Sequence, residues 1–423
     1  MVSGSEQNRA LGLSTFAFTV CFAVWTIFSI IGLKIKAELG LTDTQFAVLA
    51  ATPILTGSLS RLILGIWTDQ YGGRIVYFIL MLVTSMATYL LTIATTYEMY
   101  LVAALGVGLA GGSFAVGIAY VSQWYPAKLQ GTALGIFGVG NVGAAVTNFG
   151  APLLLIAMGD DWHEVAKVYS MVLATTAFIF FFLTKDDPKL RERKEKNEPP
   201  RPILEQLEPL KNLQVWRFAI YYFFVFGAFV ALAIWLPRFY QGAYGLELKT
   251  AGMLAAAYAL PGSVFRALGG WLSDKYGARR VMYWTFGASA ACCFFLSYPE
   301  TNYIISGIRG PIEFDIKIGL IPFVCLTIIL GFFMSLGKAA VYKHIPVYYP
   351  NNVGAVGGIV GLIGGLGGFC LPIAFGYMND TIGVWTSCFM LLFVITAVSL
   401  AWMHISIMSM EKQEPRFFPE LDK

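Results

Sequence analysis

The chain has 423 residues, of which 57% are hydrophobic and only 13% are charged, with a formal net charge of +4 at pH 7. This composition excludes an ordinary soluble globular protein. A net charge this small gives no indication of a nucleic-acid partner, and we expect none.

Apolar segments of 18 or more residues recur along the chain, and each is long enough to cross about 30 Å of hydrocarbon. We therefore expect an all-α integral membrane protein with twelve transmembrane helices. No small-residue cleavage site follows the first segment, which indicates a retained span rather than a signal peptide. The twelve predicted spans are 11–33, 46–67, 75–94, 99–124, 131–158, 167–184, 216–241, 249–272, 281–299, 318–345, 353–377 and 384–409.

The second span ends in a motif that the eighth span repeats. GSLSRLILGIWTDQYGGR occupies residues 57–74, and GSVFRALGGWLSDKYGAR follows 205 residues later at 262–279, with eight of 18 positions identical. Each copy places an arginine, Arg61 or Arg266, inside an apolar helix. Glycines one turn before and after clear the same helix face for a ligand or a close neighbouring helix. These flanking glycines are Gly57, Gly65, Gly262 and Gly270.

The duplication predicts two parallel six-helix halves with a site between them. Pseudo-symmetry would bring Arg61 and Arg266 face to face, and a guanidinium suits a planar oxyanion because its fork gives two parallel hydrogen bonds. The alternative is that each arginine extends to the membrane surface, about 9 Å away at 1.5 Å per residue. Two matched arginines favour the binding site.

Charged residues at the ends of both repeats predict gating contacts. A carboxylate at the helix end and an arginine after a glycine turn can form inter-helix contacts that change when the halves rock. The gating candidates are Asp69, Arg74, Asp274 and Arg279.

Glycines crowd the fifth and eleventh spans, and three of them match at an offset of 223 residues. Glycine lowers helix propensity but permits close packing and bending. We therefore assign packing and gating roles to Gly135, Gly138, Gly358 and Gly361. A nucleotide-binding loop is excluded because no strand precedes these apolar segments.

The segment 185–215 is the only long polar stretch, and it divides the chain into halves 1–184 and 216–423. Its charge and proline content indicate a cytoplasmic linker, with a short surface helix after Pro202. With both termini inside, cytoplasmic segments hold 18 of the 29 Lys and Arg residues, outer loops seven and spans four. This distribution favours cytoplasmic termini.

The tenth span contains Lys338, Lys343 and His344, and no Asp or Glu lies well inside any predicted span. A buried cation costs roughly 2.5–3.5 kcal/mol on insertion scales. An anionic substrate would explain why four such cations are kept. Lys338 is the candidate for proton coupling, with a cation held by backbone carbonyls as the alternative, and His344 is a candidate proton relay.

The cysteines carry no metal-ligand spacing, so we expect buried packing residues and neither a metal nor another cofactor. A membrane enzyme would need a nucleophile, a carboxylate pair or a metal set, and the spans contain none. The six cysteines are Cys21, Cys292, Cys293, Cys325, Cys370 and Cys388.

The two loop signatures resemble those of the major facilitator superfamily, and three longer segments resemble its nitrate/nitrite porter family. They are VWTIFSIIGLKIKAELGLTDTQFAVLAATPILTGSLSR (24–61), AGGSFAVGIAYVSQWYPAKLQGTALGIFGVGNVG (110–143) and GAVGGIVGLIGGLGGFCLP (354–372). The resemblance covers nearly the whole chain.

The resemblance implies a site for nitrate or nitrite. It implies that Arg61 and Arg266 bind the anion, that Phe114 and Phe226 bracket it, and that the site also has two polar contacts. These contacts are the Tyr222 hydroxyl and the Asn141 amide.

The short IFGVGN segment with Phe137, and the lysine at position 338, resemble the branch thought to transport nitrate together with protons. We therefore expect a monomeric carrier in the bacterial inner membrane that imports nitrate by proton-coupled alternating access. Nitrate/nitrite exchange is the alternative mode. A carrier of a larger organic anion and a membrane-embedded sensor are the rival functions.

Overall fold

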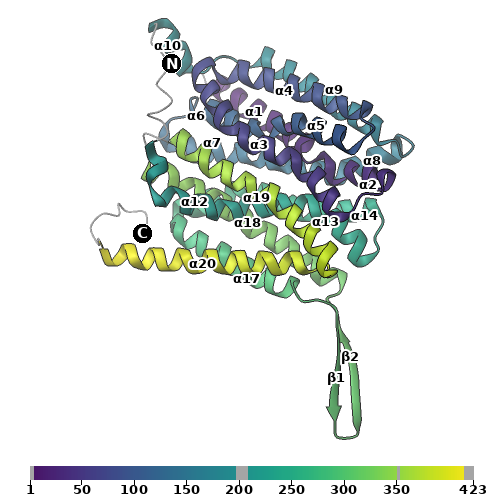
Figure 1. Ribbon diagram of the computed structural model, residues 1–423. Helices are drawn as coiled ribbons and strands as arrows, with labels where there is room; N and C mark the ends of the chain where they lie inside the picture. The colour runs from purple at the N-terminus through teal and green to yellow at the C-terminus, as the bar shows by residue number, and fades with distance from the viewer. Residues whose placement is uncertain (1–3, 197–207, 350–352, 414–423) are drawn as a thin grey trace.

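The computed structural model describes residues 4–196, 208–349 and 353–413, and its helices form two bundles that lie side by side (Figure 1). The first bundle contains α1 (Gly4–Trp25), η1 (Ile27–Ser29), α2 (Ile31–Leu39), α3 (Asp43–Tyr71), α4 (Gly73–Leu90), η2 (Leu91–Ile93), α5 (Tyr97–Gly108), η3 (Leu109–Gly112), α6 (Ser113–Ser122), α7 (Ala127–Gly138), η4 (Val139–Val142), α8 (Gly143–Ala157) and α9 (Trp162–Leu183).

The second bundle follows two short linker elements, α10 (Pro188–Lys196) and η5 (Glu208–Lys211). Its elements are α12 (Leu213–Tyr222), η6 (Phe223–Ala228), α13 (Phe229–Tyr244), α14 (Leu248–Ala259), α15 (Pro261–Val264), α16 (Arg266–Tyr276), α17 (Ala278–Leu296), β1 (Thr301–Gly307), β2 (Gly310–Ile316), α18 (Leu320–Tyr348), α19 (Val353–Ile382) and α20 (Ser387–Gln413). We call the two bundles the N-half and the C-half.

Ten helical segments in the described part of the chain are long and apolar enough to cross a membrane. Two further helices, α1 and α17, complete the twelve. They are less apolar because α1 includes Glu6 and Arg9, and α17 begins with Arg279 and Arg280. The expected fold of twelve membrane helices in two halves is therefore confirmed.

The two sequence repeats adopt the same backbone geometry at their ends. Gly72 has φ 91° and ψ 144°, and Gly277, 205 residues later, has φ 86° and ψ 135°. Each glycine ends one membrane helix and begins the next. A side chain is strained at these positive φ values, so glycine is needed at both turns.

The helices lose regular geometry at the middle of the bundle. The fourth and fifth spans contain the 3₁₀ segments η3 and η4, and the seventh contains the π-helical segment η6. The eighth span is interrupted between α15 and α16, whereas its counterpart α3 is continuous. Interrupted helices release backbone groups that can bind side chains or ligands.

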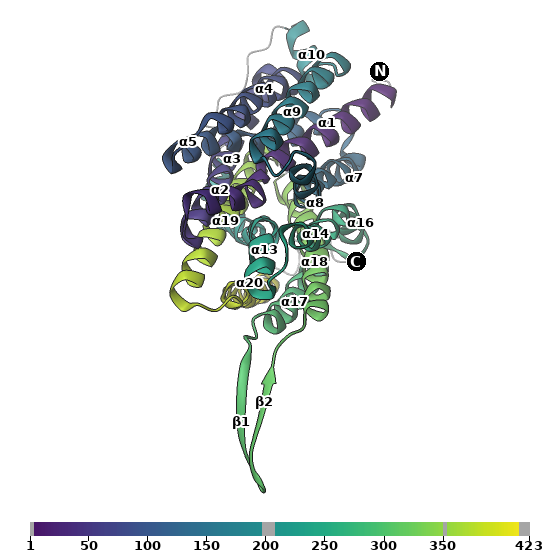
Figure 2. The same ribbon diagram turned by 90° about the vertical axis from the view of Figure 1, so that its right-hand side faces the viewer.

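One end of the bundle carries both chain termini and α10, and the other carries an antiparallel hairpin of β1 and β2 (Figures 1 and 2). We call these the termini end and the hairpin end. The sequence analysis did not predict the hairpin. The surface helix expected after Pro202 falls outside the described part, which omits residues 197–207.

Two cysteines differ from the expectation of burial. Cys325 on α18 and Cys370 on α19 are exposed, while the other four are buried. Both exposed thiols lie on membrane helices, where apolar character allows a side chain to face lipid as well as the protein interior.

Candidate functional site

Arg61 and Arg266 lie buried at the middle of the bundle, with 2% and 3% of their surfaces exposed. Arg61 is on α3 and donates from Nε to the carbonyl of Gly111 (3.2 Å) and from Nη1 to the carbonyl of Gly361 (2.5 Å). Gly111 belongs to η3 of the N-half and Gly361 to α19 of the C-half. Arg61 therefore joins the two halves at the centre of the molecule.

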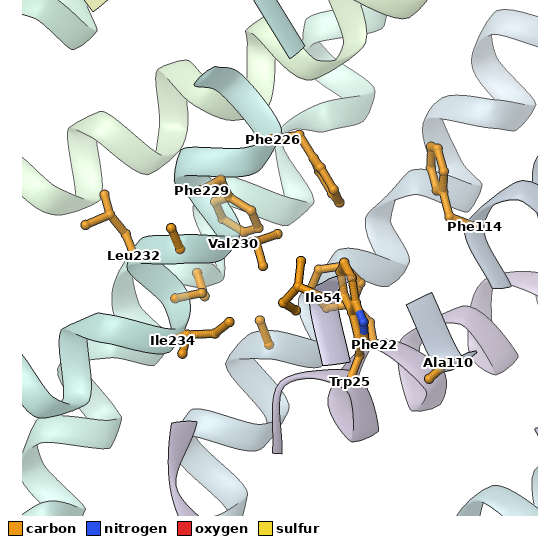
Figure 3. Close-up of a cluster of buried hydrophobic side chains, with 14 of the residues drawn as sticks. Phe22, Trp25, Ile54, Ala110, Phe114, Phe226, Phe229, Val230, Leu232 and Ile234 are labelled. Atoms are coloured by element: carbon orange, nitrogen blue, oxygen red, sulfur yellow. The ribbon is translucent and has the colours of Figure 1, made fainter. Parts of the chain in front are cut away.

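Aromatic rings surround the two guanidinium groups. The Phe114 ring lies 5.4 Å from the Arg61 Cζ atom and 5.3 Å from that of Arg266, so it is shared by both. Phe226 lies 5.1 Å from Arg61 and is stacked 6.4 Å from Phe114. Figure 3 shows Phe114 and Phe226 on ribbons from the two halves, with Trp25 nearby. The predicted bracketing pair therefore comes together around the arginines.

Four buried polar atoms of the predicted ligand residues make no hydrogen bond of standard geometry among the described residues, although Tyr222 and Arg266 lie close enough to interact. They are the Tyr222 hydroxyl, Arg266 Nη1 and both side-chain amide atoms of Asn141. An unpaired buried polar group costs about 1–3 kcal/mol. Three of the predicted ligand residues therefore carry unpaired atoms that a small polar ligand would satisfy.

Two of the predicted gating glycines lie against the site arginines. A Cβ atom on Gly138 would meet the Arg266 Cδ and Nε atoms at 2.7 Å, and one on Gly361 would lie 3.6 Å from Arg61 Nη1. Gly135 and Gly358 have only ordinary contacts, with Ala267 and Leu62. Gly138 makes room for Arg266, while the gating roles of all four glycines stay a prediction.

Lys338 is fully buried on α18, which packs against the helix α16 that begins with Arg266. Its Nζ donates to the carbonyl of Gly262 and lies 3.4 Å from the centre of the Phe229 ring. Gly262 is in α15, just before the interruption at Phe265. Among the described residues no carboxylate pairs with Lys338, Arg61 or Arg266. Three buried cations without a counter-ion in that part of the chain favour an anionic ligand.

The other charged candidates lie at the termini end and contact their own half. Lys343 pairs with Asp274, which corrects the expectation that this lysine has no acidic partner. Arg74 donates from Nε to the carbonyl of Phe181 (2.9 Å). His344 stacks on Phe218, and it lines a small pocket together with Arg279. The side chain of Asp69 lies outside the described part.

The hairpin end contains an interaction between the halves that sequence analysis missed. Asp43 of α3 is 7% exposed and accepts from Arg238 of α13 at both Nε (2.8 Å) and Nη2 (3.1 Å). Asn379 of α19 donates to the same carboxylate (2.7 Å), and Lys36 lies 3.2 Å from it. We call these four residues the hairpin-end latch.

Asp43 is the first residue of α3, and it lies inside a capping box formed by Thr42 and Gln45. Its position just outside an apolar segment gave no indication of its partner 195 residues away. Trp25 and Tyr342 were also missed as site residues, although their rings lie 5.5 Å from Arg61 and 5.7 Å from Arg266. Aromatic residues are too common in this chain to be singled out by type.

The described residues contain no group of three or more His, Cys, Asp or Glu side chains that could hold a metal ion. The chemistry available at the centre is therefore that of guanidinium, ammonium, hydroxyl and amide groups. These groups can bind and release an anion through charge-assisted hydrogen bonds.

Comparison with known proteins places this arrangement among membrane carriers. The model of the Major Facilitator Superfamily matches residues 13–310 and 249–421. A Thermus thermophilus protein named "Probable nitrate/nitrite antiporter NarK1" is 43% identical, with 97% of this chain and 94% of that protein covered. The "Nitrite extrusion protein" of Bacillus subtilis is 27% identical, with 95% of each covered.

Solved structures support the same fold at low sequence identity. A bacterial homologue of the human lysosomal transporter Spinster, in an inward-facing and occupied conformation, has a TM-score of 0.68 and 16% identity, with 96% of this chain and 97% of that chain covered. A point mutant of the nucleoside transporter NupG also has a TM-score of 0.68, with 14% identity and coverage of 94% and 99%.

Proposed function

Because this chain belongs to the major facilitator superfamily and to its nitrate/nitrite porter family, we propose that it carries nitrate across the membrane, with nitrite as a related substrate. The observation that carries this proposal is the pair of buried arginines, one from each half, whose guanidinium groups both lie against the shared Phe114 ring. A planar anion would accept hydrogen bonds from both guanidinium groups while the rings cover its faces.

Alternating access would follow from the way the anion joins the halves. Two guanidinium groups without a ligand repel each other, and an anion between them removes that repulsion. Binding would therefore favour closure around the substrate. Asn141 of the N-half and Tyr222 of the C-half would add polar contacts from opposite sides, so the ligand would be held by both halves.

Uptake of nitrate into proteoliposomes tests the substrate. We expect uptake by the parent chain and at least a tenfold loss when either arginine is replaced by glutamine, since each removes a charge-assisted hydrogen bond of about 1.5–3 kcal/mol. Competition by bulky organic anions with no competition by nitrite would contradict the proposal and favour the organic-anion carrier.

Proton-coupled import is our proposal for the mode of transport, with nitrate/nitrite exchange as the alternative. Support comes from Lys338, a buried cation that has no acidic partner among the described residues and donates to Gly262, four residues before Arg266. A buried lysine can gain and lose a proton within the transport cycle. His344, at the termini end of the same helix, would serve as a relay.

The variant Lys338→Gln tests this role, since glutamine keeps a donor for the Gly262 carbonyl but cannot carry a proton. We expect nitrate accumulation driven by a pH gradient to be lost, while exchange into nitrite-loaded vesicles continues. Lys343→Gln is the matched control because that ammonium pairs with Asp274. Unchanged gradient-driven accumulation by Lys338→Gln would contradict the coupling role.

We further propose that the protein is a monomeric carrier and not an enzyme. We place it in the bacterial inner membrane, with the termini end in the cytoplasm. Support comes from the sequence, in which the segments expected to be cytoplasmic hold 18 Lys and Arg residues and the outer loops seven. In this orientation the hairpin-end latch closes the outer side. Labelling of an added terminal tag in intact cells and in inverted vesicles tests the orientation.

A further inference from the structure

The hairpin of β1 and β2 has one apolar and one polar face. Alternate residues of a strand project from opposite faces, and residues paired directly across two antiparallel strands project from the same face. The pairing Tyr303↔Phe314 and Ile305↔Ile312 therefore places these four side chains together. The apolar face consists of Thr301, Tyr303, Ile305, Ile312, Phe314 and Ile316.

The opposite face is mostly polar and carries two carboxylates. It consists of Asn302, Ile304, Ser306, Pro311, Glu313 and Asp315. Apart from Ile304, the hairpin thus separates aromatic and aliphatic side chains from acidic ones with the two-residue period of a half-covered strand.

The bundle does not cover the apolar face. Ile305 is 49% exposed and Ile312 is 57% exposed, although both belong to residue types that are usually buried. An isolated two-stranded hairpin is at best marginally stable in water. Its apolar face therefore needs a partner surface.

The position of the hairpin indicates which surface that is. Figures 1 and 2 both show it leaving the bundle beside α17, running across the direction of the helices and past the edge of the bundle. Because the helices cross the membrane, the hairpin lies along the membrane surface. Large exposed apolar residues flank its base, with Phe294 and Phe295 at the end of α17 and Ile321 at the start of α18. The base of the hairpin therefore lies beside apolar residues that face lipid.

We propose that the hairpin binds the lipid surface, with its apolar face in the interfacial region and its acidic face in water. Tyr303 and Phe314, stacked 5.4 Å apart, are of the residue type that occupies this interface. Glu313 and Asp315 oppose deeper insertion because a carboxylate in hydrocarbon is costly. The ion pair of Lys317 with Glu300 (2.8 Å) ties the base of the hairpin together.

Neighbouring residues on opposite faces provide the test. Single cysteines at Ile304 and Ile305 are introduced into the full chain, in which the exposed Cys325 and Cys370 are replaced by serine, and are labelled with an environment-sensitive fluorophore. The protein is reconstituted in phosphatidylcholine and phosphatidylglycerol liposomes, with and without a lipid that carries a quencher just below the headgroup. Ile312→Cys and Glu313→Cys repeat the comparison on β2.

We expect labels at 305 and 312 to emit at shorter wavelength and to be quenched several-fold more by the lipid quencher than labels at 304 and 313. Equal quenching within both pairs would overturn the proposal. A second result would also overturn the proposal: the label at 305 is shielded only at a high protein-to-lipid ratio and is not quenched by the lipid quencher. That result would assign the apolar face to a second copy of the chain.

Discussion

The two arginines occupy equivalent positions in the repeat but are held differently. Arg61 donates to two carbonyls, whereas Arg266 Nη1 has no partner among the described residues. Arg61 therefore has a structural role in addition to its proposed role in binding, and Arg266 has more of its hydrogen-bonding capacity left for a ligand.

This difference predicts unequal effects of lysine at the two positions. Arg61→Lys cannot reach both carbonyls, so we expect lower thermal stability together with a loss of nitrate transport. Arg266→Lys should leave stability nearly unchanged and weaken nitrate binding roughly tenfold or more, since lysine lacks the guanidinium fork. Thermal unfolding and nitrate binding of both variants check this, and equal destabilisation would contradict it.

The Tyr222 hydroxyl provides a second prediction at the scale of the residue. Tyr222→Phe removes a buried hydroxyl that makes no hydrogen bond of standard geometry among the described residues, so folding stability should be nearly kept while nitrate affinity falls by about tenfold. Tyr120→Phe is the matched control, because its hydroxyl donates to the Lys185 carbonyl (2.6 Å) at the termini end. The control should lose about 1 kcal/mol of stability and no affinity. An unchanged affinity in Tyr222→Phe would remove the hydroxyl from the site.

Sequence reasoning found the site arginines because the duplication marks both positions at once. It found Phe114, Phe226, Tyr222 and Asn141 only through resemblance to a family. No sequence pattern distinguished Trp25 from the chain's other tryptophans, because ring contacts depend on how separate helices pack.

At the scale of the element, the glycine-rich helix α19 is adapted to its neighbours at particular positions. A Cβ atom on Gly364 would lie 2.2 Å from the Tyr222 Cδ1 atom, whereas one on Gly357 would make an ordinary 3.5 Å contact with Tyr342. Glycine is therefore needed at position 364 because the Tyr222 ring approaches closely, and not because the whole helix must be flexible.

Alanine at the two positions should therefore act in opposite directions. Gly364→Ala should cost about 1–3 kcal/mol by overpacking and displace the Tyr222 ring. Gly357→Ala should be neutral or slightly stabilising, because alanine favours the helix by about 1 kcal/mol over glycine. Thermal unfolding of both variants checks the prediction, and a stable Gly364→Ala protein would contradict the close packing of α19 against Tyr222.

Apolar length predicted the helices themselves, since each crossing requires about 20 apolar residues. The interruption at Phe265 was not predicted, because the eighth span matches the second in sequence while α3 remains continuous. The hairpin was not predicted, because strict alternation in this connection covers only residues 312–316, which is too short to distinguish a strand from a loop.

At the scale of the whole molecule, the halves are joined at several levels, and one link is a buried hydrogen bond from Asn148 of α8 to the Ala233 carbonyl of α13 (2.9 Å). Arg61 links them at the centre through Gly361, and the latch links them at the hairpin end through Asp43, Arg238 and Asn379. Opening the hairpin end requires the latch to separate. Its carboxylate is largely buried, so removing this partner of Arg238 should cost more than breaking an exposed ion pair would.

Loss of the latch carboxylate should shift the molecule towards opening at the hairpin end. In Asp43→Asn the bidentate pair with Arg238 is lost, and a penalty of about 1.4 kcal/mol would change the ratio of closed to open molecules tenfold. Spin labels at Leu39 of the N-half and Lys249 of the C-half report the separation by pulsed electron resonance. We expect a longer distance to become populated in Asp43→Asn.

Lys34→Gln is the control, because Lys34 pairs with Asp160 at the same end but within the N-half, and its loss should leave the distance unchanged. An equal change in both variants, or none in Asp43→Asn, would show that the latch does not hold the halves together.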